Sequence, residues 1–325
     1  MKTLPTYVFA SLAAAALMTA APAQAQNWPT KPVTVIVPFA AGGNTDVAAR
    51  IFADRLSQRL GQQFVIENKS GAGGSLGIAA MAKAQPDGYT LGVVTAGTLF
   101  ILPHIYKDKL GYDSRKDIRP VAQVGTQPNM LIVHPSVPAK TVPEFIAYIK
   151  ANPDKLSYGS SGLGTSQHLC MELIVQATGA KITHVPYRAS NQIIQDLLGG
   201  QIQMTCDQFS TAYPQVQAGK AKAIAVSSLE RYGFDNSIPT LAESIPGLDV
   251  TWSAVFIAPA NVPENIRKKL ADELIAITRE PAIIEKLKML GVTPASLSGA
   301  DLEKTVLADY DKWLPIVERA KIPQP

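Results

Sequence analysis

The 325-residue chain is poor in charged residues, which make up 17% of it, and its formal net charge is only +4. Its Lys and Arg residues are scattered rather than gathered in runs, so the sequence gives no sign of a nucleic-acid-binding surface. Apart from one N-terminal stretch, no apolar run approaches the roughly 20 residues that a membrane span needs. With 46% hydrophobic residues, the chain is typical of a globular α/β protein.

Motifs for cofactors and metals are also missing. The chain has no S-x-x-K and no P-loop pattern, and it has no H-x-x-x-H or C-x-x-C pair that would hold a metal. Gly71, Gly73 and Gly77 resemble a dinucleotide fingerprint only loosely. We therefore predict no catalytic residue, no metal and no cofactor.

Residues 1–25 form a predicted secretory signal peptide. Lys2 is their one charged residue, an apolar stretch follows over residues 7–21, and Ala23-Gln24-Ala25 provides a small-x-small cleavage pattern. Cleavage before Gln26 leaves a net charge of +3. We expect a soluble, exported protein, with a membrane anchor as the alternative.

Three glycine-bearing loops stand at predicted helix starts. Residues 33–50 run from a β-branched strand through a small-residue loop into a helix opened by Thr45 and Asp46. The other two loops are residues 70–75 (SGAGGS) and 159–166 (GSSGLGTS). A helix start offers unpaired backbone N–H groups and the positive end of the helix dipole. The three loops therefore predict sites for a carboxylate or a phosphate.

Strands, loops and helices alternate over residues 33–95 and again over residues 156–226. The predicted elements include a helix over residues 166–178 and a strand over residues 202–205. Alternation of this kind predicts α/β lobes, each with a mostly parallel sheet flanked by helices.

A repeat marks the expected joints between the lobes. Residues 130–153 and 255–281 share an apolar strand, two prolines, an amphipathic helix and a further proline. If both strands cross between the lobes, they form a hinge over a cleft. The resulting division is residues 26–127 plus 252–325 for lobe I, and residues 128–251 for lobe II.

Cys170 and Cys206 are the two cysteines of the chain. In an oxidising compartment an even pair predicts a disulfide, with two buried thiols as the alternative. We place Cys170 in the helix after the third loop and Cys206 at the end of a strand. A catalytic Cys170 assisted by His168 is disfavoured, because residues two apart on a helix do not face each other.

Several segments are similar to those of a known family. They are WPTKPVTVIVPFAAGGNTDVAAR, VIENKSGAGGSLG, PDGYTL, YGSSGLGTSQHL, HVPYRASNQIIQDLLGGQI and PTLAES. Through them the chain resembles the receptors of tripartite tricarboxylate transporters, the Bug proteins. The resemblance implies a two-lobe periplasmic binding protein of the flytrap type. Such a receptor closes on a small carboxylate and delivers it to the large and small membrane subunits of a transporter. We expect a monomer that binds no nucleic acid.

The resemblance, together with the loops, predicts a set of ligand-binding residues from both lobes. On lobe I they are Phe39, Ala41, Gly42, Gly43, Asn44, Thr45, Asp46, Ser70, Gly71, Ala72, Gly73, Gly74 and Thr95. On lobe II they are Ser161, Gly164, Thr165, His168, Tyr187 and Asp207.

Some of these assignments have alternatives. His168 either contacts the acid or stands behind the residues that do. Asp207 either accepts from the ligand or caps the following helix, and Tyr187 either lines the cleft or only packs. Arg188 either pairs with the carboxylate or points to solvent. Asn44 stands where the family often has a third glycine, which makes it a candidate for ligand choice.

The sequence leaves the identity of the ligand open. A tricarboxylate, a dicarboxylate, an aromatic acid and an amino acid all remain candidates. Two other functions compete with the receptor: a sensor that presents its ligand to a membrane regulator, and an enzyme built on the same scaffold.

Overall fold

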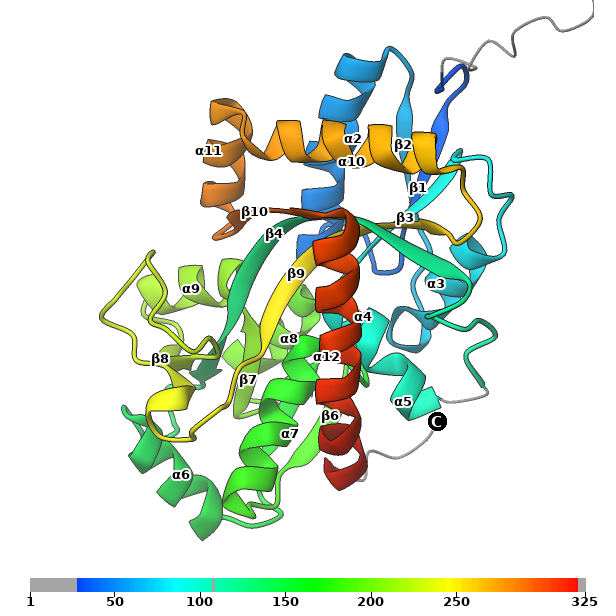
Figure 1. Ribbon diagram of the computed structural model, residues 1–325. Helices are drawn as coiled ribbons and strands as arrows, with labels where there is room; N and C mark the ends of the chain where they lie inside the picture. The colour runs from blue at the N-terminus through cyan, green and yellow to red at the C-terminus, as the bar shows by residue number, and fades with distance from the viewer. Residues whose placement is uncertain (1–27, 107–108, 321–325) are drawn as a thin grey trace, which may run out of the picture.

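The computed structural model describes residues 28–106 and 109–320, and Figure 1 shows their arrangement. The predicted signal peptide lies outside these residues. Within the described residues, no helix is long and apolar enough to cross a membrane.

The first half of the described chain alternates strands with helices, as the sequence predicted, and then adds one long strand. Its elements are β1 (Val33–Val37), α2 (Asn44–Leu60), β2 (Phe64–Asn68), α3 (Ser75–Ala82), β3 (Thr90–Val94), α4 (Ala96–Phe100), α5 (Leu102–Tyr106) and β4 (Ile118–Val133).

The alternation then restarts and ends in a group of helices. These elements are α6 (Val142–Ala151), β5 (Ser157–Ser160), α7 (Ser166–Thr178), β6 (Thr183–Pro186), α8 (Ser190–Leu198), β7 (Met204–Gln208), α9 (Phe209–Gln217), β8 (Lys222–Val226), β9 (Thr251–Pro259), α10 (Glu264–Thr278), α11 (Pro281–Met289), β10 (Thr293–Ser298) and α12 (Gly299–Ala320).

Two parallel three-stranded units form the two lobes. In lobe I, β1 pairs in parallel with β2 and β3. In lobe II, β5 pairs in parallel with β6 and β7. The strands of such units are covered by helices on both faces, which explains the nearly continuous apolar run of β1. The pairings that join the two units are antiparallel, so the sheet as a whole is mixed.

The long strand β4 runs through both lobes. Its first part pairs antiparallel with β9 and β10, and its last part pairs with β7 and β8. β4 and β9 are also the strands that the repeated pattern of the sequence marked as crossings. Gln127 of β4 lies opposite Trp252 of β9, at the positions where we predicted the lobe boundary. The division by residue number remains a prediction.

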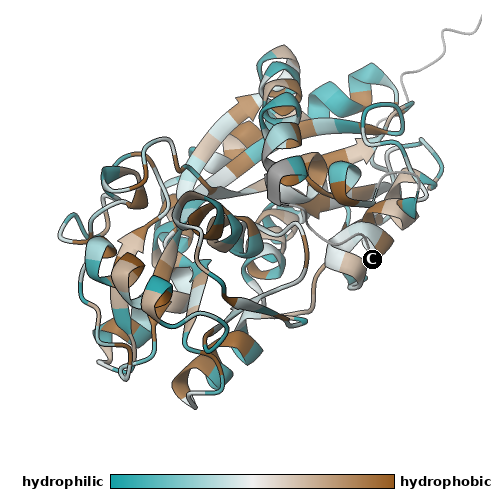
Figure 2. Ribbon diagram, turned by 90° about the horizontal axis from the view of Figure 1, so that it is seen from below, coloured by the Kyte–Doolittle hydropathy of each residue, from teal (hydrophilic) through white to brown (hydrophobic). Residues whose placement is uncertain are grey.

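Helices cover the curved sheet and enclose separate apolar cores. One core lies between α2, α10 and the strands of lobe I, with Phe52 and Trp252 fully buried in it. Apolar positions lie on the strands and on the helices alike, and the polar positions lie mainly on the outer helices and loops (Figure 2). The last helix, α12, packs against α4 and α5 of lobe I and also against α7 of lobe II. It runs along the front of the molecule in Figure 1.

Local signals set the helix ends more accurately than the strand ends. α7 occupies the predicted residues because the Thr165 side chain caps its start and Gly179, in the left-handed conformation, ends it. The strand predicted over residues 202–205 instead runs from Met204 to Gln208. Asp207 therefore lies inside a strand and does not follow one, and Cys206 is likewise internal to it.

Candidate functional site

A pocket lies between the lobes and encloses about 440 Å³, including its open mouth. Residues from five segments line it: Phe39, Ala40, Gly43, Asn44, Thr45, Thr95, Ser161, Thr165, Ser166, Gln167, Arg188, Ala189, Ser190 and Gln208. Among these lining residues Arg188 is the only ionisable one, and it is exposed at the mouth. Most of the residues that line the pocket are therefore polar but uncharged.

Several helices begin at this pocket. α2 and α7–α9 each contribute residues of their first turn or their N-cap to its lining. The N-caps Gly43, Ala189 and Gln208 make no side-chain capping hydrogen bond. The N-cap side chains therefore leave the first N–H groups of α2, α8 and α9 uncapped, although the Gln192 N–H donates to Asn191 Oδ1 and the Ser210 N–H donates to Gln127 Oε1. Each of these ends also carries the positive end of a helix dipole.

The loop before α2 is held by a carboxylate of the same helix. The Gly42 N–H donates to Asp46 Oδ2 over 2.9 Å, and Arg50 donates to both carboxylate oxygens. Asn68 adds a bond from β2 at 2.8 Å. Burial raises the pKa of Asp46, but these hydrogen bonds outweigh it and leave the pKa below its usual value. Asp46 is 2% exposed and does not line the pocket, so it shapes the loop from behind.

The loop before α7 is held in a similar way by Thr165 and His168. Thr165 Oγ1 donates to the Gly162 carbonyl at 2.8 Å and accepts from the His168 N–H. The Gly164 N–H donates to His168 Nδ1 at 3.3 Å. Thr165 lines the pocket, whereas Gly164 and His168 lie behind it.

His168 belongs to a buried group of aromatic side chains. It packs on His184 with ring centroids 4.5 Å apart and stacks on Tyr158. Burial, and next the nearby His184, lower the pKa of His168 to about 3, and burial lowers that of His184 to about 4. Both imidazoles are therefore neutral near pH 7, and His168 acts as a hydrogen-bond acceptor for the loop.

Asp207 holds the residues that line the lobe II side of the pocket in place. Its carboxylate accepts from the Gln167 amide, from Ser190 Oγ at 3.0 Å and from the Gln208 N–H at 2.7 Å. These partners all line the pocket, although Asp207 does not. Because the side chain is fully buried, desolvation raises its pKa to about 6, against the effect of the hydrogen bonds.

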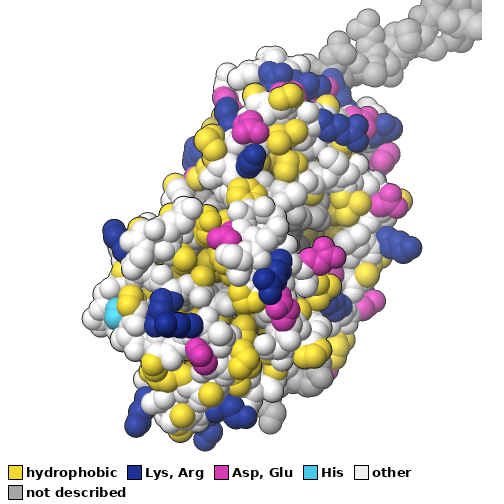
Figure 3. All heavy atoms as spheres, turned by 90° about the vertical axis from the view of Figure 1, so that its left-hand side faces the viewer, with side chains coloured by type: hydrophobic (Ala, Val, Ile, Leu, Met, Phe, Trp, Pro, Cys, Tyr) yellow, Lys and Arg dark blue, Asp and Glu magenta, His cyan; other side chains and the backbone are white. Residues whose placement is uncertain are grey.

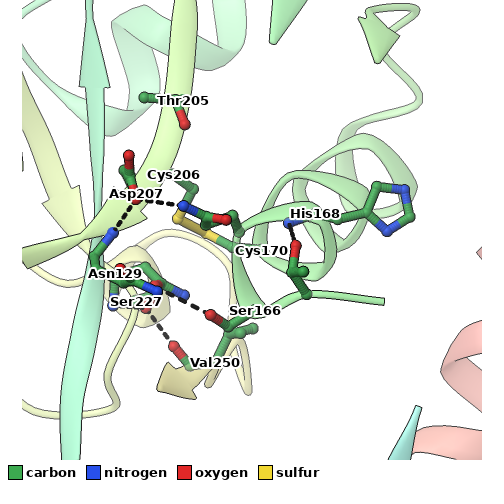
Figure 4. Close-up of a disulfide and its surroundings, with 12 residues drawn as sticks. Asn129, Ser166, His168, Cys170, Thr205, Cys206, Asp207, Ser227 and Val250 are labelled. Atoms are coloured by element: carbon green, nitrogen blue, oxygen red, sulfur yellow. Dashed lines mark hydrogen bonds between the residues drawn. A yellow bond between two sulfur atoms is a disulfide. The ribbon is translucent and has the colours of Figure 1, made fainter. Parts of the chain in front are cut away.

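A disulfide ties the strand that carries Asp207 to α7. Cys170 on α7 is bonded to Cys206 on β7, and their Cα atoms are 6.1 Å apart. Figure 4 shows the bridge between the helix that carries Ser166 and His168 and the strand that carries Asp207. The bridge therefore fixes two parts of the site whose positions are 36 residues apart in the sequence.

The second glycine loop contacts lobe II directly and leaves the pocket lining to other residues. A Cβ built on Gly73 would lie 2.6 Å from the carbonyl oxygen of Leu163, and one built on Gly162 would lie 3.6 Å from Gly73 Cα. Ser70 and Ala72 are exposed. A backbone approach this close needs glycine, so the loop forms part of the contact between the lobes.

The predicted site residues thus fall into two groups. Those that line the pocket are Phe39, Gly43, Asn44, Thr45, Thr95, Ser161 and Thr165. Those that do not are Ala41, Gly42, Asp46, Ser70, Gly71, Ala72, Gly73, Gly74, Gly164, His168, Tyr187 and Asp207. Most of the second group shape the loops. The Tyr187 hydroxyl donates to Asp196 at 2.7 Å, so it is engaged within lobe II.

Sequence reasoning assigned no site role to Gln167, Ala189 and Gln208, which line the pocket, and it named Ser190 only as a variable position. It included Ala40 and Ser166 only as members of the first and third glycine-bearing loops. A signal was available for some of them: Ser190 opens the α8 pattern, and Ser166 follows the capping Thr165. Gln167 could not be recognised, because its role depends on Asp207, 40 residues away.

Sequence reasoning missed one hydrolase-like pattern, which is centred on Ser75 in the second glycine-bearing loop. Residues 73–77 match the G-x-S-x-G spacing of hydrolase elbows. Ser75 is only 5% exposed, and it lines no part of the pocket between the lobes. The described residues also contain no cluster of His, Cys, Asp and Glu that could hold a metal.

The surface has no large patch of one charge on the side seen in Figure 3. Lys and Arg side chains alternate there with Asp and Glu. This face therefore offers no surface of a single charge.

Comparisons with known proteins agree with this architecture. A family model described as "Tripartite tricarboxylate transporter family receptor" matches residues 48–322. A UPF0065 protein of Bordetella pertussis is 35% identical over 308 residues, covering 94% of each chain.

Solved structures extend the similarity to the fold. R. palustris Rpa4515 with adipate has a TM-score of 0.85 at 35% identity, covering 90% of this chain and 98% of that one. MatC from Rhodopseudomonas palustris with bound malate has a TM-score of 0.82 at 32% identity, covering 89% and 100%. The chain therefore belongs to the tripartite tricarboxylate transporter receptor family, whose members are periplasmic solute-binding proteins.

Proposed function

We propose that the receptor captures a small carboxylate in the pocket between its lobes. The observation that carries this proposal is the convergence of α2, α8 and α9 on one pocket without a side-chain cap on any of them. A carboxylate there accepts from backbone N–H groups and lies at the positive ends of several helix dipoles. The adipate and malate of the two related structures support the same ligand class.

Backbone N–H groups do most of the binding in this proposal. Thr45 adds a hydroxyl group to the lining, whereas the hydroxyl hydrogens of Thr165 and Ser190 are donated to the Gly162 carbonyl and to Asp207. A desolvated anion needs every acceptor lone pair satisfied, because each unpaired buried one costs about 1–3 kcal/mol or more. Arg188 at the mouth adds the one cation that attracts the anion before closure.

The family supports two further steps. The loaded receptor delivers its ligand to the membrane subunits of a tripartite transporter, and the chain reaches the periplasm through a cleaved signal peptide. It binds its ligand without transforming it. N-terminal sequencing of the exported protein tests the cleavage before Gln26, and chemical analysis of the ligand after long incubation tests the absence of turnover.

A thermal-shift screen with carboxylates tests the central proposal. Adipate, malate, citrate and benzoate are each compared with the corresponding neutral amide. We expect at least one acid to raise the melting temperature, because it binds only the folded state, and its amide to have no effect. A panel in which amides stabilise as well as acids, or in which no acid stabilises, contradicts the proposal. Calorimetry on the best acid then gives the affinity.

A further inference from the structure

Asn44 joins the two lobes at the edge of the pocket. It is the first residue of α2 in lobe I, and its side chain reaches α9 of lobe II, where Ser210 Oγ donates to Asn44 Oδ1 at 2.9 Å. The two residues are 166 positions apart in the sequence. The contact therefore exists only while the lobes are together.

The same side chain has an unused donor. Asn44 is 6% exposed, and its Nδ2 is buried without a hydrogen-bond partner among the described residues. A buried amide N–H without a partner is costly and rare. Since Asn44 lines the pocket, a ligand acceptor atom held there would satisfy this donor.

A second hydrogen bond links Ser210 to the strands that run between the lobes. The Ser210 N–H donates to Gln127 Oε1 at 3.4 Å. Gln127 is 1% exposed and lies on β4, opposite Trp252 of β9. One chain of hydrogen-bonding groups thus leads from the pocket through Asn44 and Ser210 to the paired crossing strands.

We propose that Asn44 is a latch that couples ligand binding to lobe closure: its Oδ1 holds Ser210 across the cleft, and its Nδ2 donates to an acceptor oxygen of the ligand. The ligand contact rests on the proposed carboxylate function, whereas the Ser210 contact does not. A ligand oxygen that engages Nδ2 fixes the amide orientation that Ser210 needs. The ligand consequently favours the closed form through this side chain.

Four variants separate the two halves of the latch. N44D keeps an acceptor for Ser210 but replaces the ligand donor with a carboxylate. S210A removes the contact across the cleft and leaves the Asn44 amide in place. N44A removes both contacts, and N44A/S210A completes a double-mutant cycle. S228A is the matched control, because Ser228 Oγ donates within its own exposed loop, to the Glu230 carbonyl.

Calorimetry with the acid that binds best in the screen measures how Asn44 and Ser210 contribute to ligand affinity. We expect S210A to weaken binding about threefold to tenfold, as for one neutral hydrogen bond, and N44A and N44D to weaken it by more than tenfold. The double variant should equal N44A within twofold, because the two residues act through one bond. Fold-changes of N44A and S210A that multiply in the double variant would overturn the coupling.

Small-angle X-ray scattering of the ligand-free proteins measures how the Asn44–Ser210 contact affects lobe closure. We expect S210A and N44A to have a larger radius of gyration than the wild type, and N44D and S228A to match it. If S210A matches S228A in radius of gyration, Asn44 is not a latch, whatever the ligand is. If the variants expand as expected but no acid binds the wild type, only the ligand contact and the proposed function fail.

Discussion

The carboxylate of Asp46 accepts a hydrogen bond from the backbone N–H of Gly42, four residues earlier, at 2.9 Å. Asp46, in the first turn of α2, therefore also shapes the loop that brings Gly43 and Asn44 to the pocket. The acid lies behind the loop and never faces the ligand, which avoids repulsion between two carboxylates.

We expect D46A to weaken carboxylate binding more than tenfold and to lower the free energy of unfolding by about 2 kcal/mol, the scale of a buried hydrogen bond to a charged group. Calorimetry and urea denaturation measure the two effects. D54A on the same helix is the control, because Asp54 is exposed and does not line the pocket. Unchanged binding in D46A would remove this loop from the site.

The lowered pKa of Asp46 has a consequence for stability at low pH. A carboxylate whose pKa is lower in the folded state stabilises the fold above its unfolded pKa, and this contribution is lost as the pH falls through the folded value. The wild type should therefore lose stability below about pH 4 more steeply than D46N. Melting curves between pH 3 and 6 show the difference.

We expect Asp207 to lower the stability of the fold near neutral pH while it supports ligand binding. Its pKa is raised to about 6 by burial, so the unfolded chain releases this proton at lower pH than the folded protein. Stability contributed by the group therefore falls as the pH rises from about 4 to 6. We expect D207N to raise the melting temperature at pH 7.5 relative to the wild type, and not at pH 4.

The same variant should bind its ligand more weakly by several-fold, because an amide holds Gln167 and Ser190 less firmly than a carboxylate does. Asp196 offers a control, since it bonds Tyr187 away from the pocket. A D207N protein that is both more stable and fully able to bind would show that Asp207 does not order the pocket.

The buried imidazoles should make the receptor sensitive to mild acid. The pKa of His168 is about 3 in the folded protein and about 6.5 when unfolded. Between these values the unfolded chain binds the extra proton, so stability falls as the pH drops below about 6.5. At pH 5 the loss from His168 is roughly 2 kcal/mol. H168Q should lose less stability than the wild type between pH 7 and 5. H134Q, at a half-buried histidine that does not line the pocket, is the matched control.

Reduction of the disulfide should loosen the pocket as well as the fold. The bridge closes a loop with a sequence separation of 36, for which chain entropy gives about 4 kcal/mol of stabilisation. We expect dithiothreitol to lower both the melting temperature and the ligand affinity, because the bridge joins α7 to the strand of Asp207. The C170A/C206A variant should behave like the reduced protein and should not respond to dithiothreitol.

Local chemistry predicted much of the fold. The glycine-bearing loops before the helices and the repeated strand-to-helix pattern predicted most of the elements and the strands that run between the lobes. Strand ends were less accurate, because the predicted strand stopped before the polar Asp207. Nothing near that residue in the sequence indicates that Gln167 and Ser190 will solvate it inside the sheet.

The site was predicted by region rather than by residue. The helix starts at Asn44 and Ser166 do face one pocket. Motif resemblance did not distinguish a residue that lines the pocket, such as Thr165, from one that supports the loop behind it, such as His168. That distinction depends on side-chain direction and on partners from distant segments, which a single sequence does not contain.

β4 runs without a break through both lobes, so a movement of one lobe relative to the other has to bend it. A 16-residue strand spans about 53 Å, and β9 accompanies it with irregular register near Pro120 and Gln123. The register shifts are the places where this paired ribbon bends most readily, because the ladder is locally interrupted there. We therefore expect the lobes to move by bending of the ribbon rather than about a free joint.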